Sequence, residues 1–510
     1  MFAKVYGAAT LGVDGLLISV EVDSSNGMPS FDIVGLPNAS VRESKERVRT
    51  AIKNSNMLLR SEKLTINLAP ADIKKDSPGL DLPIAIGLLS AQGTIPVDNT
   101  KGCLFTAELS LEGNLCGVYG VLPMVITARE RGLTKIFVSK DNANEALLVD
   151  GVEVYAPENL SELVMFLNGQ DNLAPEQKTE YVDDEPLYGL QDDFADVQGQ
   201  FLAKRALEIA AAGGHNVLMV GVPGAGKTML AQRVNSILPE LTREEALEVT
   251  KIYSIEGKLG KDGGLIRKRP FQHPNHDASA AAMIGGGTIP RPGQVTLAHH
   301  GVLFLDEFPE FHKSVLEVLR EPLEERKVTI SRVNATLTFP SSVMLICAMN
   351  PCPCGWYADP KHDCRCSPQE IRRYTRKLSG PLLDRIDIHI KVPRVDYKDL
   401  SSKRKAESSA VIRERVEAAR RIQLERLKPY NIFCNAQMNH TLIEKFCQIT
   451  DRADDLLRMF YEKKHASARS YDRIKKVART IADLEGMEKI DQMHIGEAIK
   501  LRNDFELDMF

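Results

Sequence analysis

The stretch NVLMVGVPGAGKTML, residues 216–230, decides how the chain must fold around it. An apolar run comes first, a glycine-rich segment follows, and a helix-forming segment comes directly after. Gly221, Gly224 and Gly226 let the backbone curl so that its N–H groups, including that of Ala225, and the N-terminus of the helix face an anion. This order predicts a buried strand, a phosphate-binding loop and a helix.

Two residues of the loop have side chains suited to a nucleoside triphosphate and its magnesium ion. Lys227 would place positive charge at the β- and γ-phosphates, and Thr228 would offer a hydroxyl ligand to Mg²⁺. A chance glycine-rich turn is the alternative, but the strand before the loop and the helix after it disfavour that interpretation. The sequence therefore predicts a site for ATP and Mg²⁺.

Two further apolar runs end in polar side chains. GVLFLDE, residues 301–307, ends in Asp306 and Glu307, and VMLICAMN, residues 343–350, ends in Asn350. We expect Asp306 to hold the Mg²⁺ shell, Glu307 to polarise the attacking water, and Asn350 to lie beside the γ-phosphate. A helix N-cap for the Asp-Glu pair and a plain turn for Asn350 are the structural alternatives.

The rest of the chain divides by composition and periodicity. Its 510 residues exceed one hydrophobic core, so two or three domains are expected. Residues 1–168 alternate short apolar strands with helices, which predicts an α/β domain, and the acidic, polar residues 169–195 predict a linker. Residues 196–395 predict a parallel sheet with helices on both faces, and residues 396–510 predict a helical lid.

Overall composition excludes few functions. The 65 basic and 69 acidic residues give a net charge of −4, so any surface for nucleic acid must be local. Nine cysteines, four of them between positions 352 and 366, suit a reducing compartment better than a disulfide framework. Asp14 interrupts what would have to be an apolar signal region, and no apolar stretch is long enough for a membrane span. We therefore expect a soluble, cytoplasmic protein without a membrane partner.

The three strand ends, in this order, resemble those of AAA+ ATPases, with Asn350 in the position of the first sensor. Residues 269–307 (RPFQHPNHDASAAAMIGGGTIPRPGQVTLAHHGVLFLDE), NPCPCG and SGPLLDRIDI are similar to the magnesium-chelatase-related branch, and specifically to the bacterial ComM/YifB proteins. The similarity extends over essentially the whole chain. It implies a hexameric ring that hydrolyses ATP to move on single-stranded and branched DNA, driving branch migration in recombination and natural transformation.

Resemblance assigns three arginines, and an inserted loop offers a fourth. Arg385, in LLDRID, falls at the position of the arginine finger, and Arg469, in SARSYDR, at that of the second sensor. Arg332 falls near the tip of EERKVTISRVNATLTF, which resembles the pore hairpin of the related replicative helicases, and Arg291 in GGGTIPRPGQ is a second candidate for DNA contact. A surface ion pair is the plain alternative for Arg385 and for Arg469.

The N-terminal segments KKDSPGLDLPIAIGLL and AELSLEGNLCGVYGVLPMVITARERGL resemble the proteolytic domain of Lon, which uses a Ser-Lys pair. On that pattern the nucleophile position holds Gly79 and the lysine position falls at about Leu122. Ser77 and Lys75 are nearby but do not match. We therefore expect a Lon-like fold without peptidase activity.

Four cysteines form two C-x-C pairs, Cys352 with Cys354 and Cys364 with Cys366. Four thiolates suffice for a tetrahedral structural Zn²⁺, with His362 as a competing ligand, and four free thiols are the alternative. The following segment RCSPQEIRRYTRK, residues 365–377, is basic, and either a phosphate-binding surface or a solvated helix face fits it.

Three functions remain open at this stage. A DNA motor is favoured by the ComM/YifB resemblance. A magnesium-chelatase ATPase subunit is disfavoured by the additional Lon-like domain, and an ATP-dependent protease or protein remodeller is disfavoured in its protease form by Gly79 and Leu122.

Overall fold

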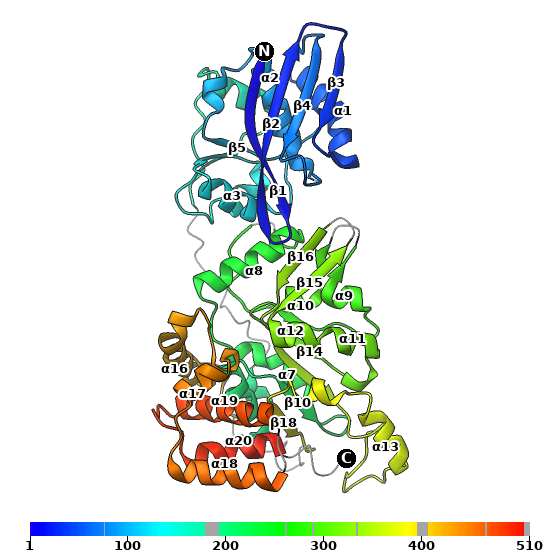
Figure 1. The fold of residues 1–510 in the computed structure, drawn as a ribbon, viewed down its shortest axis with the longest axis vertical. Coiled ribbons are helices and arrows are strands. Elements are labelled where there is room, and N and C mark those ends of the chain that lie inside the picture. The colour runs from blue at the N-terminus through cyan, green and yellow to red at the C-terminus, as the bar shows by residue number, and fades with distance from the viewer. Residues whose placement is uncertain are drawn as a thin grey trace. The chain divides into compact units, whose positions relative to one another are not determined.

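The computed structural model describes residues 1–75, 77–178, 193–260, 263–287, 290–332, 335–394, 406–464 and 467–503 (Figure 1). The chain divides into two compact units. Unit 1 comprises Met1–Val182 and Arg243–Ile266, and unit 2 comprises Asp183–Thr242 and Arg267–Phe510.

A mixed sheet, seven-stranded within the described residues, forms the centre of unit 1 in the order β3-β4-β2-β1-β5-β8-β9. Neighbours pair antiparallel between β1, β2 and β4, and parallel elsewhere. Its strands are β1 (Phe2–Leu11), β2 (Asp14–Ser25), β3 (Ser30–Val34), β4 (Lys63–Ala69), β5 (Cys103–Phe105), β8 (Lys135–Phe137) and β9 (Glu153–Tyr155), and a separate short pair is β6 (Glu108–Leu109) with β7 (Leu115–Cys116).

Helices cover this sheet: α1 (Ala39–Asn54), α2 (Asp81–Ala91), α3 (Val121–Glu130), α4 (Lys140–Ala146) and α5 (Leu160–Leu167). Helix α2 is buried along its whole length, because LPIAIGLLSA is apolar or small on every side. Its one charged residue, Asp81, is neutralised by Arg47, whose Nε lies 2.9 Å from the carboxylate. The α/β fold predicted for residues 1–168 is confirmed.

Helix α8 (Arg243–Ile255) belongs to unit 1, although the chain enters it from unit 2. Leu247 packs against a core cluster of unit 1, and the N–H of Gly120 donates to the carbonyl of Ser254 at 3.1 Å. The Ser254 hydroxyl donates to the buried carboxylate of Glu145. Placing residues 243–266 in the nucleotide-binding domain was therefore wrong, because helical periodicity shows that a helix is amphipathic but not which core it joins.

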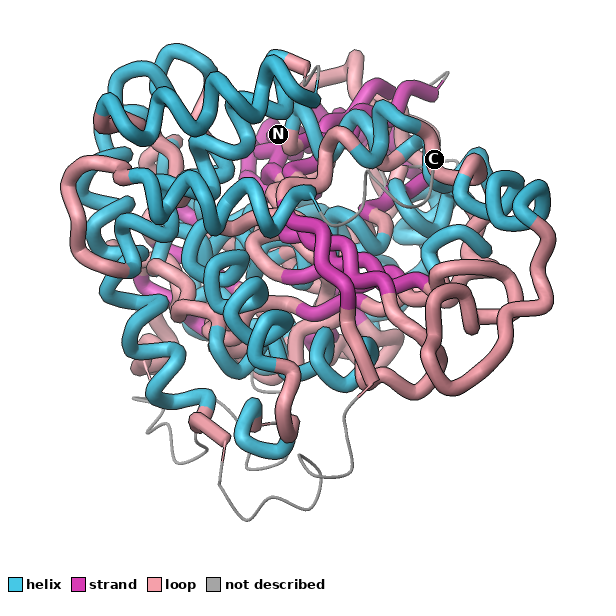
Figure 2. Tube along the Cα trace, turned by 90° about the horizontal axis from the view of Figure 1, so that it is seen from below, coloured by secondary structure: helices cyan, strands magenta, loops and turns pink. Residues whose placement is uncertain are grey.

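The sheet of unit 2 is parallel and, within the described residues, five-stranded in the order β11-β14-β17-β10-β18. Its strands are β10 (Val217–Val220), β11 (Phe271–Gln272), β14 (Val302–Leu305), β17 (Met344–Met349) and β18 (Ile388–Lys391). Every residue of β10, β14 and β17 is buried or nearly so, which requires cover on both faces, and helices surround the strands (Figure 2). The order places the carboxyl ends of β14, β17 and β10 side by side.

Helices α6 (Phe201–Gly213), α16 (Ser409–Leu427), α19 (Ala468–Leu484) and α20 (Gln492–Asn503) share one hydrophobic core with this sheet. The predicted helical lid is thus helical but is not a separate compact unit. Its predicted start at residue 396 lies outside the described residues. The other α-helices of unit 2 within the described residues are α7 (Lys227–Arg233), α9 (Ala280–Ile284), α10 (Gln294–Leu297), α11 (Lys313–Val318), α12 (Arg320–Glu325), α13 (Pro368–Thr375), α14 (Gly380–Leu383), α17 (His440–Phe446) and α18 (Asp451–Lys464).

Two short hairpins complete unit 2: β12 (Gly285–Gly286) with β13 (Arg291–Pro292), and β15 (Lys327–Arg332) with β16 (Ala335–Pro340). The middle of the predicted linker, residues 179–192, lies outside the described residues, but both of its ends are packed. Glu176 donates its N–H to the carbonyl of Val154 at 2.7 Å, and Phe194 is fully buried. Within the described part of the chain, no helix is long and apolar enough to cross a bilayer.

Candidate nucleotide site and metal centre

The glycine-rich loop connects β10 to α7 and is shaped by its glycines. Gly224 (φ +74°) and Gly226 (φ +88°) adopt the left-handed conformation that favours glycine, and Gly226 caps the helix N-terminus. A Cβ on Gly221 would lie 2.4 Å from the carbonyl oxygen of Val392, so no larger residue fits there. Ala225 is buried within the turn. The loop therefore surrounds a helix N-terminus whose N–H groups have no partners within the helix.

Four of the predicted residues meet at the carboxyl ends of the strands. The Lys227 ammonium donates to the carbonyl of Gly221 at 2.7 Å and to Oδ1 of Asn350 at 3.0 Å. The Thr228 hydroxyl donates to the Asp306 carboxylate at 2.6 Å. Burial lowers the pKa of Lys227, although the negative charge of Asp306 acts in the opposite direction. A cation, a hydroxyl, a carboxylate and an amide thus surround one point, as Mg²⁺-triphosphate chemistry requires.

Glu307 lies at the edge of this cluster rather than inside it. Its backbone has a φ of +50°, which is uncommon for a residue with a side chain and is concentrated at functional sites. The side chain is 57 % exposed, and its carboxylate lies 3.6 Å from Nδ1 of His276. His276 could not be singled out from the sequence, because a histidine in the loop RPFQHPNHD has no local signal that connects it with Glu307, 31 residues later.

Arg385 and Arg469 do not join this cluster; instead, both contact Glu324 near the C-terminal end of α12. Arg385 pairs with the Glu324 carboxylate and also donates to the carbonyl of Pro381 at 2.6 Å. Arg469 Nη2 lies 3.4 Å from the other carboxylate oxygen. The Arg385 side chain is 8 % exposed, whereas that of Arg469 is 60 % exposed. Sequence reasoning missed Glu324, because three similar glutamates in REPLEERK gave no basis for choosing one.

A buried polar network next to Arg385 connects the sheet with α19. Asp387 accepts a hydrogen bond from the N–H of Asn216 at 3.2 Å and pairs with Arg473. His215 lies between Asp387, 3.4 Å from Nδ1, and the hydroxyl of Thr480, 2.8 Å from Nε2. Burial alone would raise the pKa of Asp387, but the charge of Arg473 and the contact with His215 outweigh it and hold the pKa below its usual range. The network fixes the predicted finger segment relative to the helical region.

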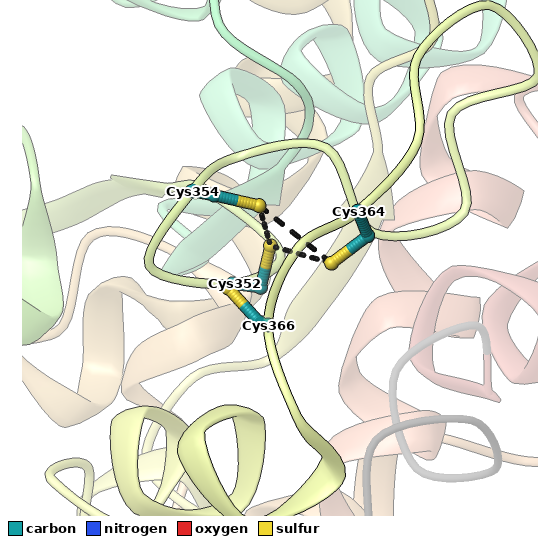
Figure 3. A group of neighbouring side chains, drawn as sticks. All are labelled: Cys352, Cys354, Cys364 and Cys366. Carbon is teal, nitrogen blue, oxygen red and sulfur yellow. Dashed lines mark hydrogen bonds between the residues drawn. The ribbon is translucent and has the colours of Figure 1, made fainter.

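The four predicted metal ligands come together in the loop between β17 and α13 (Figure 3). The Sγ atom of Cys352 lies 3.4 Å from that of Cys354 and 3.7 Å from that of Cys364, and Cys354 and Cys364 are 3.6 Å apart. All four Sγ atoms, including that of Cys366, lie within 4.8 Å of one another. Tetrahedral zinc with Zn–S bonds of about 2.3 Å requires S–S separations of roughly 3.8 Å. The three closest thiols thus lie within about 0.4 Å of the separations that a tetrahedral zinc ion requires.

His362, the competing ligand considered from the sequence, is engaged elsewhere. Its Nδ1 lies 2.9 Å from the carboxylate of Asp359, and its ring stacks on Trp356 with centroids 4.3 Å apart. The structure therefore groups the four cysteines, without His362, as the candidate metal ligands.

The two arginines proposed for DNA contact come from neighbouring hairpins. Arg332 ends β15, and its Nη2 lies 3.6 Å from the position that a Cβ on Gly286 would take. Gly286 pairs directly with Arg291 across the β12–β13 hairpin. Both arginines are exposed, and within the described part of the chain neither forms an ion pair. The tips at residues 288–289 and 333–334 lie outside the described residues.

The basic segment after the cysteines forms the exposed face of α13. Ile371 and Tyr374 are buried beneath it, and the helix begins with a capping box between Ser367 and Glu370. A surface hollow of about 420 Å³ is lined by Gln369, Arg372, Arg373, Arg376 and Lys377. Local positive charge therefore exists on a chain whose net charge is negative.

The Lon-like positions in unit 1 hold no Ser-Lys pair. The Lys75 ammonium is fully buried and donates to the carbonyls of Gly35, at 3.0 Å, and Pro70. The Ser77 hydroxyl accepts the N–H of Gly79 at 3.2 Å, which caps a short helical turn. Leu122 is buried in an apolar core. No hydrogen bond joins Ser77 to Lys75 among the residues that the structure describes.

Comparison with known proteins agrees with this geometry. Three family profiles match: "Magnesium chelatase, subunit ChlI" over residues 193–400, "Subunit ChlI of Mg-chelatase" over residues 20–142, and "Magnesium chelatase, subunit ChlI C-terminal" over residues 406–502. With the phosphate-binding loop and the three strand ends, they define the chain as an AAA+ ATPase of the magnesium-chelatase type.

Full-length relatives narrow the assignment. The "Competence protein ComM" of Haemophilus influenzae is 44 % identical over 98 % of this chain and 97 % of its own length. The "Uncharacterized protein YifB" of Escherichia coli is 42 % identical over 98 % of this chain and 96 % of its own. The chain belongs to the ComM/YifB family. "Lon protease 2" of Bacillus subtilis is 28 % identical over 31 % of this chain, in agreement with a Lon-like domain.

Proposed function

We propose that this chain is the subunit of a cytoplasmic, hexameric ATP-driven ring that moves on single-stranded and branched DNA. The ring drives branch migration during recombination and natural transformation. The observation that carries this function is the pair of adjacent hairpins that present Arg291 and Arg332, exposed and without ion-pair partners among the described residues. In a ring, one such pair from each subunit would contact successive phosphates of a strand. The name of the Haemophilus influenzae relative, a competence protein, agrees with a role in DNA uptake and recombination.

ATP would bind with its phosphates on the loop from Gly221 to Thr228. Lys227 would neutralise the β- and γ-phosphates, while Thr228 and Asp306 would hold Mg²⁺. Glu307 would polarise the attacking water and Asn350 would orient it against the γ-phosphate. Arg385 of one subunit would stabilise charge on the ATP of its neighbour, and Arg469 would report the nucleotide to the helical region.

Two other functions make different predictions about what stimulates ATP hydrolysis. A magnesium-chelatase subunit would respond to a porphyrin-binding partner, and a protein remodeller to unfolded protein. We expect single-stranded and forked DNA to raise the ATPase rate of the purified protein several-fold. A rate that is indifferent to DNA would contradict the DNA motor. We expect no peptidase activity, because Gly79 and Leu122 fall at the positions of the Ser-Lys pair that Lon uses.

We further propose that the cysteine cluster holds one structural Zn²⁺. The four thiolates leave no open position, so the ion would hold the loop after Asn350 and would not take part in the reaction. We expect about one zinc per chain by elemental analysis, and substitution Cys364→Ser should remove most of it and lower the melting temperature. Cys116→Ser, at a half-buried cysteine of unit 1, is the matched control. If wild-type protein from which zinc has been removed keeps its melting temperature, the site is excluded.

Removal of Arg332 should weaken DNA binding in a salt-dependent way. Each phosphate contact that is lost reduces the slope of log K against log salt by about 0.7 for single strands. Loss of Arg332 should therefore reduce the slope by about 0.7 for each subunit that contacts the strand, and Arg291→Gln with Arg332→Gln by about 1.4 for each such subunit. Fluorescence anisotropy with labelled oligonucleotides at several salt concentrations measures this slope. Arg49→Gln, an exposed arginine of α1, removes the same charge and should leave the slope unchanged. Equal slopes for the wild type, the Arg332 variant and the double variant would exclude the hairpins from the DNA-contacting surface.

A further inference from the structure

Glu324 is the one carboxylate that both predicted nucleotide-sensing arginines contact within the described residues. Arg385 reaches it from the turn after α14, and Arg469 from the first turn of α19. The pKa of Glu324 lies below its usual value, chiefly because Arg385 donates a hydrogen bond to the carboxylate. Burial raises this pKa, but the charges of Arg385 and Arg469 lower it further. Glu324 is therefore ionised at neutral pH and neutralises one of two adjacent positive charges.

The residues that follow Glu324 form the root of the β15–β16 hairpin. Arg326 has a φ of +55°, ends α12, and is followed at once by β15. Its guanidinium donates to the carbonyls of Ala436, at 3.0 Å, and Gln437, at 3.3 Å. The four residues 324–327 thus connect three parts of unit 2. Glu324 contacts the two arginines, Arg326 contacts the helical region, and Lys327 is the first residue of the hairpin.

The present pairing prevents Arg385 from acting on another subunit. An arginine finger must place its guanidinium on the γ-phosphate of a neighbour, but the Arg385 side chain is 8 % exposed and is held by its own chain. Its Nε is buried and has no hydrogen-bond partner among the described residues, so the pairing uses only part of the guanidinium. Carboxylate and phosphate oxygens offer a guanidinium the same type of charge-assisted hydrogen bond. The two anions therefore compete for the same group.

We propose that Glu324 is a positioning residue, which holds Arg385 until the γ-phosphate of ATP bound at the neighbouring subunit takes its place as the partner of Arg385. This inference rests on the proposed role of Arg385 as the arginine finger. Glu324 holds Arg385 and Arg469 when the neighbouring site carries no triphosphate. Arrival of ATP transfers Arg385 to the γ-phosphate and leaves Glu324 with Arg469 alone. Because Glu324 stands three residues before the first residue of β15, the exchange acts directly on the root of the hairpin that carries Arg332.

The substitution Glu324→Gln keeps the size of the side chain and removes the charge that holds Arg385. We expect the ATPase rate without DNA to rise at least threefold and the stimulation by DNA to shrink by a similar factor, because the finger no longer has to leave a carboxylate. Glu324→Asp should restore much of the wild-type behaviour. Glu325→Gln is the matched control and should behave as wild type, because Glu325 is one residue away and, among the described residues, forms an ion pair only with exposed Lys327, at 3.3 Å.

A double variant separates positioning from a merely structural ion pair. If Glu324 acts through Arg385, the variant Glu324→Gln with Arg385→Ala must have the low ATPase rate of Arg385→Ala alone. An additive rise in the double variant, wild-type rates for Glu324→Gln, or a loss of ATPase activity in Glu324→Gln would each overturn the inference. Full activity of Arg385→Ala itself would instead refute the finger assignment on which it rests.

Discussion

Replacement of Lys227 by alanine is expected to lower the rate of ATP hydrolysis by at least about 100-fold, the usual scale for loss of a charge-stabilising group. Lys227 is the only residue whose side chain bonds both the loop carbonyl of Gly221 and the amide of Asn350 among the described contacts. Its removal takes away the cation that the phosphate-binding loop itself supplies to the β- and γ-phosphates. Phosphate release at saturating ATP measures the effect, and DNA binding should persist because the hairpins are unchanged.

Lys313→Ala provides the control for this experiment. It removes an exposed ammonium from the start of α11, in the same unit. Its rate should equal that of wild type. A Lys227→Ala protein that retains more than about a tenth of the wild-type rate would contradict the proposed nucleotide site.

Arg385→Ala is expected to inactivate the ring as strongly, but through the neighbouring subunit. Mixing Arg385→Ala with Lys227→Ala subunits should then restore activity, because an intact nucleotide site can lie next to an intact finger. In a closed ring with head-to-tail interfaces, random 1:1 mixing makes about one interface in four productive, so up to about a quarter of wild-type activity is expected.

Two features of this mixing experiment make it discriminating. Each variant alone is expected to hydrolyse ATP at least about 100-fold more slowly than wild type, so activity recovered well above that level must arise between subunits. If Arg385 instead served only to hold Glu324 within its own chain, no mixture would recover activity. Wild-type rates for Arg385→Ala alone would also refute the finger.

The nucleotide site was predictable because its signals are local. A buried strand, a glycine-rich turn and a helix lie within fifteen residues, and parallel strands bring their carboxyl ends together wherever the sheet order places them. Lys227, Thr228, Asp306 and Asn350 meet for that reason. The clustering of the four cysteines was also predictable, since C-x-C pairs near each other in sequence can meet in one loop.

Contacts made across the fold could not be predicted in this way. The choice of Glu324 among neighbouring glutamates depends on where α14 and α19 place two arginines. Helix α8 carries the same amphipathic pattern in either unit, and its true place follows from the partners of Ser254 and Leu247. The adjacency of Arg291 and Arg332 likewise depends on how two hairpins pack and not on either sequence alone.

The proposed function requires that ATP hydrolysis at the nucleotide site moves DNA that is bound by the hairpins. Branch migration of a labelled four-way or three-stranded junction by the purified protein tests this claim most directly. We expect ATP-dependent conversion of the junction by wild-type protein, and none by Lys227→Ala protein that still binds the same DNA. A wild-type protein that hydrolyses ATP and binds the junction but never converts it would contradict the account.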